Sequence, residues 1–174
     1  QVVNIKPDGS SSDMQIAAYE GCVHVSGDGS KVVFRATPTT VDGSYVTDLV
    51  DGGNVSQSGY PSVYVRDMSI TSGTPITVVN EAQDGTPLDR NWFTPSSVQL
   101  SGDGQLVAFQ SASDAYTVTY GGGNDPISVE DIFPGPQIYV KNLSTGEVIV
   151  ASSAADGTAG NGYSLMNSDS GHMS

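Results

Sequence analysis

One segment of the chain occurs twice, 75 residues apart. VSGDGSKVVF runs from Val25 to Phe34, and LSGDGQLVAF runs from Leu100 to Phe109. Self-similarity at a fixed period is typical of repeat architectures, in which each repeat is one supersecondary unit that packs on its neighbours. The chain is therefore expected to hold two copies of one structural unit.

The similarity extends beyond this segment. SVYVRDM (Ser62 to Met68) returns as QIYVKNL (Gln137 to Leu143), again 75 residues later, and the N-terminal VVNIKPDGS is echoed near Thr77 and Val148. We place the repeat units at about 22–97 and 98–171, with 1–21 as the tail of a preceding unit and 172–174 as the start of a following one.

Each unit contains four strand signals. β-branched and aromatic residues dominate short runs, and Gly, Asp, Ser and Pro separate them. Asp-Gly, in the repeated Gly-Asp-Gly, is the strongest short hairpin signal, because both turn positions tolerate positive φ. The predicted strands are Cys22 to Ser26, Lys31 to Ala36, Val63 to Arg66 and Ile76 to Asn80, then Val98 to Ser101, Gln105 to Ala112, Ile138 to Lys141 and Val148 to Val150. We expect an all-β fold of four-stranded antiparallel meanders, as in propeller blades.

Paired apolar residues, Val32/Val33 and Leu106/Val107, predict that the second strand of each unit is buried on both faces. The connection between the second and third strands is long in both units, at 37–61 and 113–136. Strand parity places these connections on the same face as the segments between units. We expect tight turns on the other face.

The motifs resemble a known family. Ser-x-Asp-Gly-x-x-Val-x-Phe, followed by Val-Tyr-Val-(Arg/Lys)-(Asp/Asn) and by an Asp-Gly-Thr and Gly-Asn-Gly linker, is similar to the TolB-like β-propeller repeat of exported bacterial and archaeal proteins, a relative of WD-type repeats. The resemblance implies a disc of blades that binds proteins, occasionally sugars or ions, and that in some enzymes adjoins a hydrolase domain. This chain has material for two blades and a part, so it is incomplete as a closed disc.

Composition limits the partners. The net charge of −13 repels phosphate backbones and anionic lipids, so we expect neither nucleic acid nor membrane surfaces as partners. No apolar run approaches the ~20 residues of a membrane span, so we expect no membrane insertion. Cys22 is the one cysteine, which excludes an internal disulfide, and we expect it to be a buried strand residue. The chain begins at Gln1 rather than Met, from which we expect a processed or excised piece. The acidic composition suits a secreted protein, a salt-adapted protein or one that collects divalent cations. The TolB-like resemblance implies an extracellular, periplasmic or cell-surface location.

The long connections are rich in oxygen ligands. Ca²⁺ prefers six to eight oxygens, and one Asp/Asn-rich loop beside an acidic strand end could supply them. The spacing matches no EF-hand, and acidic loops also serve simply to stay solvated. The candidate calcium ligands are Asp42, Asp48, Asp51, Asn54, Asp67, Asn124, Asp125 and Asp131.

Aromatic residues occupy the same connections, where they could stack on sugar rings, form a protein-binding patch or simply anchor long loops. The candidate ligand-binding residues are Tyr60, Trp92, Phe93, Tyr116 and Tyr120. Tyr64 and Tyr139, in contrast, lie within strands and are expected in the core.

A two-blade meander leaves exposed sheet edges that other blades must cover. We therefore expect a non-enzymatic structural module that self-associates through its terminal strands into a ring or filament, or forms part of a larger propeller. The residues expected to carry assembly are Val2, Val3, Ile5, Val23, Val25, Val148, Val150 and Met173. The alternatives are a propeller that binds carbohydrate, or protein in a calcium-dependent manner, and the accessory propeller of a larger hydrolase.

Overall fold

The computed structural model describes residues 10, 15–16, 22–37, 39–41, 44–46, 62–71, 75–81, 97–111 and 137–155. All regular secondary structure in these ranges is β-strand, which confirms the predicted all-β fold. Over the same ranges no helix has the length and apolar character that crossing a membrane requires.

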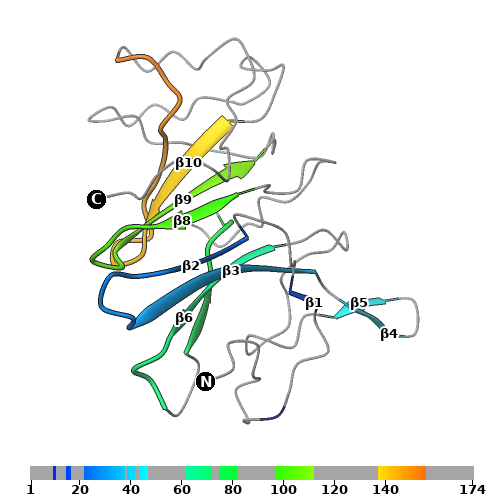
Figure 1. The fold of residues 1–174 in the computed structure, drawn as a ribbon. Helices are drawn as coiled ribbons and strands as arrows, with labels where there is room; N and C mark the ends of the chain where they lie inside the picture. Colours follow the sequence, from blue (N-terminus) through cyan, green and yellow to red (C-terminus); the bar gives the residue numbers. More distant parts are fainter. Residues whose placement is uncertain are drawn as a thin grey trace.

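Sheet 1 is built on a four-stranded antiparallel meander (Figure 1). Its strands are β2 (Val23–Val25), β3 (Lys31–Thr37), β6 (Ser62–Asp67) and β7 (Ile76–Val78). A fifth strand, β1 (Gln15–Ile16), pairs with the end of β3 on the edge where β2 also pairs. The four main strands agree with the predicted ones, whereas β1 was not predicted.

Sheet 2 repeats the meander. Its strands are β8 (Val98–Leu100), β9 (Leu106–Ser111), β10 (Gln137–Asn142) and β11 (Val148–Val150), paired in that order. The register of the strands is also repeated. In sheet 1, Tyr64 lies opposite Phe34 on one side and Val78 on the other. In sheet 2, Tyr139 lies opposite Phe109 and Val150 in the same way. The two sheets are thus copies of one unit, consistent with incomplete propeller-like blades.

A small hairpin lies inside the first long connection. Strands β4 (Thr39–Val41) and β5 (Ser44–Val46) pair with Val41 opposite Ser44. This hairpin was not predicted, because the segment was expected only as part of a long connection. Asp42-Gly43 between two β-branched runs is the sequence signal that identifies it.

The second strand of each unit is largely buried on both faces. In β3, Val32 to Ala36 are all buried, as predicted. In β9, Val107 to Ser111 are buried, but Leu106 is 37% exposed, so the prediction is wrong for Leu106. Leu106 opens its strand directly after the turn, on the face opposite to Val107, which points into the core.

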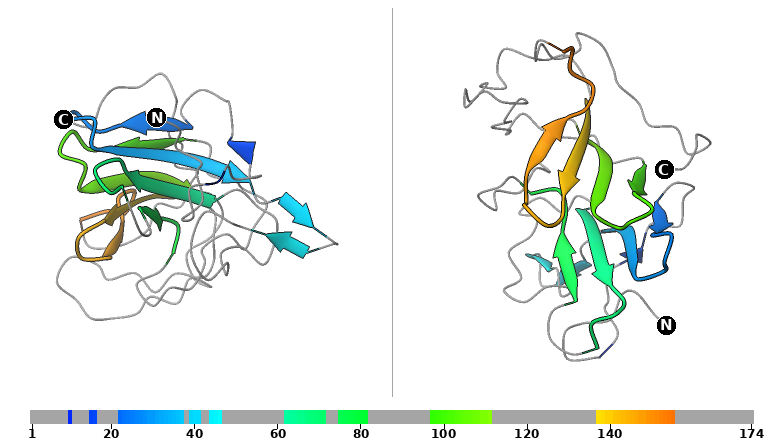
Figure 2. Two further views of the ribbon diagram at one scale, coloured as in Figure 1. Left: turned by 90° about the horizontal axis from the view of Figure 1, so that it is seen from below. Right: turned by 90° about the vertical axis from the view of Figure 1, so that its left-hand side faces the viewer.

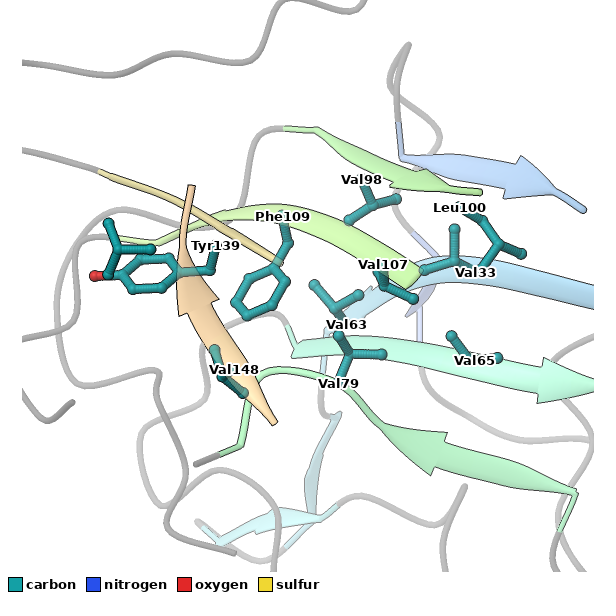
Figure 3. Packing of buried hydrophobic residues seen from close by; sticks show 11 residues of the cluster. Val33, Val63, Val65, Val79, Val98, Leu100, Val107, Phe109, Tyr139 and Val148 are labelled. Carbon is teal, nitrogen blue, oxygen red and sulfur yellow. The ribbon is translucent and has the colours of Figure 1, made fainter. Parts of the chain in front are cut away.

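The core lies between the two sheets (Figure 3). One face of sheet 1 contributes valines from β3, β6 and the end of β7, and sheet 2 contributes aliphatic and aromatic side chains from all four strands. The cluster consists of Val33, Val63, Val65, Val79, Val98, Leu100, Val107, Phe109, Tyr139, Val148 and Val150. Burial of this apolar surface holds the two sheets together, at about 25 cal/mol per Å² removed from water.

An aromatic pair stacks within each sheet. The rings of Phe34 and Tyr64 are 5.7 Å apart, and those of Phe109 and Tyr139 are 5.8 Å apart. Tyr64 and Tyr139 are both buried, as predicted for residues within strands. Cys22 is buried too, as expected.

Candidate functional site

The contact between the sheets, which we call the joint, is directional. Strand alternation puts Val33, Val65 and Val79 on one face of sheet 1, which we call its outgoing face. The residues of sheet 2 that meet them, including Leu100 and Val107, lie on the opposite face of the repeat, its receiving face. Each repeat unit therefore has two different docking faces, and the joint uses one from each unit.

The repeated Ser-Gly-Asp-Gly motif builds the turn beside the joint. The amide of Ser26 donates to the carbonyl of Lys31 across 2.9 Å, so the turn between β2 and β3 contains four residues. The Ser26 hydroxyl accepts from the Lys31 amide at 2.9 Å and donates to Asp28 Oδ1 at 2.7 Å. Asp28 Oδ1 also accepts from the Ser30 amide at 2.9 Å.

These bonds stabilise the ionised Asp28. The Ser30 amide, followed by the Ser26 hydroxyl, lowers the pKa of this carboxyl to about 2, although the group is exposed. The expectation of a turn at Gly-Asp-Gly is confirmed, with Asp28 and Gly29 as its two central residues. The Ser26 hydroxyl closes the turn, in which Gly29 has a φ of +72°.

The turn between β8 and β9 has the same geometry. Ser101 Oγ donates to Asp103 Oδ1 at 2.6 Å and accepts from the Leu106 amide at 2.9 Å, while the Gln105 amide donates to Asp103 at 3.0 Å. The Ser101 hydroxyl is the main cause that lowers the pKa of Asp103. Repetition of the motif is therefore explained by its repeated role in the turn.

The two turns touch each other at one end of the joint. The Gly27 amide donates to the Gly102 carbonyl at 2.8 Å, and Lys31 Nζ donates to the Gly104 carbonyl at 2.9 Å. A Cβ added to Gly27 would lie 3.0 Å from the Gly102 carbonyl oxygen, so glycine permits this approach. Figure 2 (right) shows the turn end of the molecule facing the viewer.

Adjacent to the turns, the inner strands β2 and β8 also meet. The Leu100 amide donates to His24 Nδ1 at 3.3 Å. Of the two histidines in the chain, His24 thus has a structural partner across the joint.

A buried lysine anchors sheet 2 to the end of β7. Lys141 Nζ donates to the carbonyls of Val78 at 3.3 Å and Glu81 at 3.2 Å. Burial lowers the pKa of Lys141 and raises the pKa of the Glu81 carboxyl, and the attraction between the two charges opposes both shifts. Lys141 was not predicted as a functional residue, because a basic residue in an otherwise apolar strand does not reveal what lies opposite.

The receiving face of sheet 1 is exposed at β2, at positions where the receiving face of sheet 2 is buried in the joint. Val98 and Leu100 of β8 are 2% and 0% exposed, because the outgoing face of sheet 1 covers them. Their counterparts 75 residues earlier, Val23 and Val25 of β2, are 48% and 49% exposed. The same positions of the repeat are therefore buried in one unit and open in the other.

The residues predicted for assembly are found in two environments. Val23 and Val25 are exposed, whereas Val148 and Val150 are buried in the core of sheet 2. Val2, Val3, Ile5 and Met173 lie outside the described residues.

One predicted calcium ligand is described. Asp67 Oδ1 accepts hydrogen bonds from the Ser69 amide, at 2.9 Å, and hydroxyl, and the hydroxyl bond is the main cause that lowers its pKa. Within the described ranges no three His, Cys, Asp or Glu side chains gather where they could hold a metal. The other candidates, Asp42, Asp48, Asp51, Asn54, Asn124, Asp125 and Asp131, lie outside these ranges, so the calcium site stays a prediction.

The candidate ligand-binding aromatics Tyr60, Trp92, Phe93, Tyr116 and Tyr120 also lie outside the described residues. The face formed by the long connections therefore stays a prediction as well. Tight turns at the opposite end are described, and they form the turn end of the joint.

Comparisons with known proteins give only weak similarity. No protein-family model matches the chain, and no curated protein matches it. Among solved structures, TolB from Acinetobacter baumannii aligns with 78% of this chain and 33% of its own length, at 15% identity and a TM-score of 0.22. A similarity this low supports no conclusion about fold or activity, so the two-sheet architecture rests on the structure itself.

Proposed function

We propose that this chain is a non-enzymatic structural module that adds further blade-like sheets to its ends, through other copies of itself or the remaining blades of a larger propeller. The observation that carries the proposal is the difference between β2 and β8. Val23 and Val25 are half exposed where Val98 and Leu100, at the same repeat positions, are buried by a neighbouring sheet.

Physical chemistry favours covering these side chains. Burying a valine side chain fully contributes about 1.5–3 kcal/mol relative to leaving it exposed. A repeat unit has a receiving face that is shaped for another unit, and terminal units of repeat proteins need a polar cap when they have no neighbour. β2 ends sheet 1 with two valines rather than with polar residues, which favours a role in association.

The experiment is sedimentation velocity over a concentration series. The wild type is expected to associate, and a Val23→Ser/Val25→Ser double variant is expected to associate at least tenfold more weakly. Ile70→Ser is the matched control, because Ile70 is 40% exposed but lies in the turn region after β6 and is not part of the core cluster between the sheets. A wild-type chain that stays at 18.0 kDa at all concentrations contradicts association between copies and leaves the remaining blades of a larger propeller as the neighbours.

Two further parts of the proposal concern calcium at the contacts between modules and the location of the protein. Association in Ca²⁺ that is lost in chelator would support calcium at the contacts between modules, and equal association in both solutions would remove calcium from the proposal. Export to the cell surface, periplasm or exterior is proposed from the TolB-like motifs and the acidic composition.

A further inference from the structure

We infer that the partner is a second copy of this chain, docked head to tail so that sheet 2 of one copy covers β2 of the next. The inference rests on the proposed function and specifies its geometry. The joint inside the chain is the template, since several of the residues that build it have a counterpart 75 positions away at an open end.

The receiving end lies on β2 and its turn. Val23 and Val25 are exposed there, as described above. A Cβ built on Gly104 would meet the Lys31 side chain at 3.3 Å, whereas one built on its counterpart Gly29 meets nothing described within 4 Å. Phe34 and Tyr64 on the same face are buried, so the open area is limited to β2 and the adjoining turn.

The outgoing end lies on β9, β11 and the second turn. Leu106 is the counterpart of Lys31 and is 37% exposed; Ile149 of β11 lies on the same face and is 40% exposed. Gly102 is the counterpart of Gly27, and a Cβ built on it meets nothing described within 4 Å. The outgoing face of sheet 2 is thus open at Leu106, Ile149 and the turn that contains Gly102, whereas Ala108, the counterpart of Val33, is buried.

The template orients the second copy. The Gly102 amide of one copy would donate to the Gly27 carbonyl of the next, as Gly27 donates to Gly102 within the chain. Leu106 would lie over Gly29, where Lys31 lies over Gly104. In the contact between copies, the apolar side chain of Leu106 takes the place that the Lys31 ammonium group has in the joint. We therefore expect the affinity between copies to be insensitive to salt.

The two surfaces are different, so the contact is heterologous. Each copy can bind one neighbour through β2 and another through Leu106 and Ile149. Contacts of this kind close into a ring if the rotation between copies closes and otherwise extend as a filament.

Complementation between two blocked variants tests this geometry. Val23→Ser/Val25→Ser blocks the receiving end. Leu106→Glu blocks the outgoing end, because its carboxylate would approach Asp28 of the next copy, and Leu106→Lys is the matched control that places a cation there instead. We expect each blocked variant to sediment as a monomer and the Leu106→Lys variant to associate at least tenfold more tightly than Leu106→Glu. An equimolar mixture of the two blocked variants should form a species of twice the 18.0 kDa monomer mass and nothing larger.

The outcomes separate the inference from the proposed function. A monomeric wild type overturns the head-to-tail joint and leaves the proposed function with one kind of neighbour, the remaining blades of a larger propeller. A wild type that associates while the mixed variants stay monomeric, or while Leu106→Glu associates normally, overturns the head-to-tail joint and leaves a different contact between modules. Circular dichroism of each variant shows whether a loss of association reflects loss of the fold.

Discussion

The backbone amide of Gly27 donates a hydrogen bond to the carbonyl of Gly102 across 2.8 Å, so the turns of the two repeat units touch directly. This contact explains why glycine precedes the turn Asp in sheet 1, where a side chain would meet the neighbouring backbone at 3.0 Å. The two glycines are at equivalent positions of the repeat, but of the two only Gly27 lies where an added Cβ would meet the other sheet among the described residues.

The first prediction follows from this asymmetry. Gly27→Ala should lower the free energy of unfolding by about 1–3 kcal/mol, because the turns must move apart. Gly102→Ala is the matched control and should change it by less than about 0.5 kcal/mol, since the space around its Cβ is open. Urea denaturation in the Val23→Ser/Val25→Ser background measures both without a contribution from association, and equal losses would contradict the asymmetry.

Alanine substitutions of Leu100 and Val25, which occupy the same position of the repeat, should lower the free energy of unfolding by different amounts. Leu100→Ala should cost about 2–5 kcal/mol, because it leaves a cavity in the core between the sheets. Val25→Ala, at the same repeat position, should cost less than about 0.5 kcal/mol in dilute monomeric protein, because Val25 is half exposed. Urea denaturation at low protein concentration compares them; a large loss for Val25→Ala would mean that β2 is already covered.

Lys141 should be a major contributor to the joint. Lys141→Met removes the donor from the Val78 and Glu81 carbonyls and should lower the free energy of unfolding by about 1–3 kcal/mol. Glu147→Gln, at an exposed position in the adjacent turn, is the control and should change it by less than about 0.5 kcal/mol. Stability of Lys141→Met equal to that of the control would show that the lysine bonds across the joint contribute nothing.

Protonation of the turn carboxylates Asp28 and Asp103 should lower the stability of the fold in acid. Asp28 has a pKa of about 2 in the fold and an ordinary value of 3.8, so its stabilising effect is complete above pH 3.8 and is lost as the pH falls through 2. Asp103 shifts in the same direction and adds to the effect. The carboxyl carbon resonance of Asp28 should titrate near pH 2 in the wild type and at higher pH in Ser26→Ala; a wild-type midpoint near 3.8 would contradict the turn geometry.

The main strands were predictable because local signals mark them. β-branched and aromatic runs separated by Asp-Gly and Ser-Gly fix β2, β3, β6 to β11 within a few residues, and the 75-residue repeat fixes their common topology. β1 was missed because two residues, Gln15 and Ile16, carry no periodic pattern.

The joint could not be predicted in detail, because its contacts join residues that are distant in sequence. Lys31 bonds the Gly104 carbonyl and Lys141 bonds the Val78 carbonyl only once the sheets have stacked. The exposure of Leu106 has the same origin, since an apolar pair in sequence does not reveal which of its members faces the neighbouring sheet. An assembly role for Val23 and Val25 was expected from the exposed sheet edges of a two-unit repeat, and it stays a prediction.

The measurement that tests association most directly is the mass and shape of the native particle, by light scattering and negative-stain microscopy of the full chain at high concentration. The head-to-tail joint predicts a ring of several copies or a filament of regularly spaced modules. A homogeneous 18.0 kDa particle under the same conditions would contradict it.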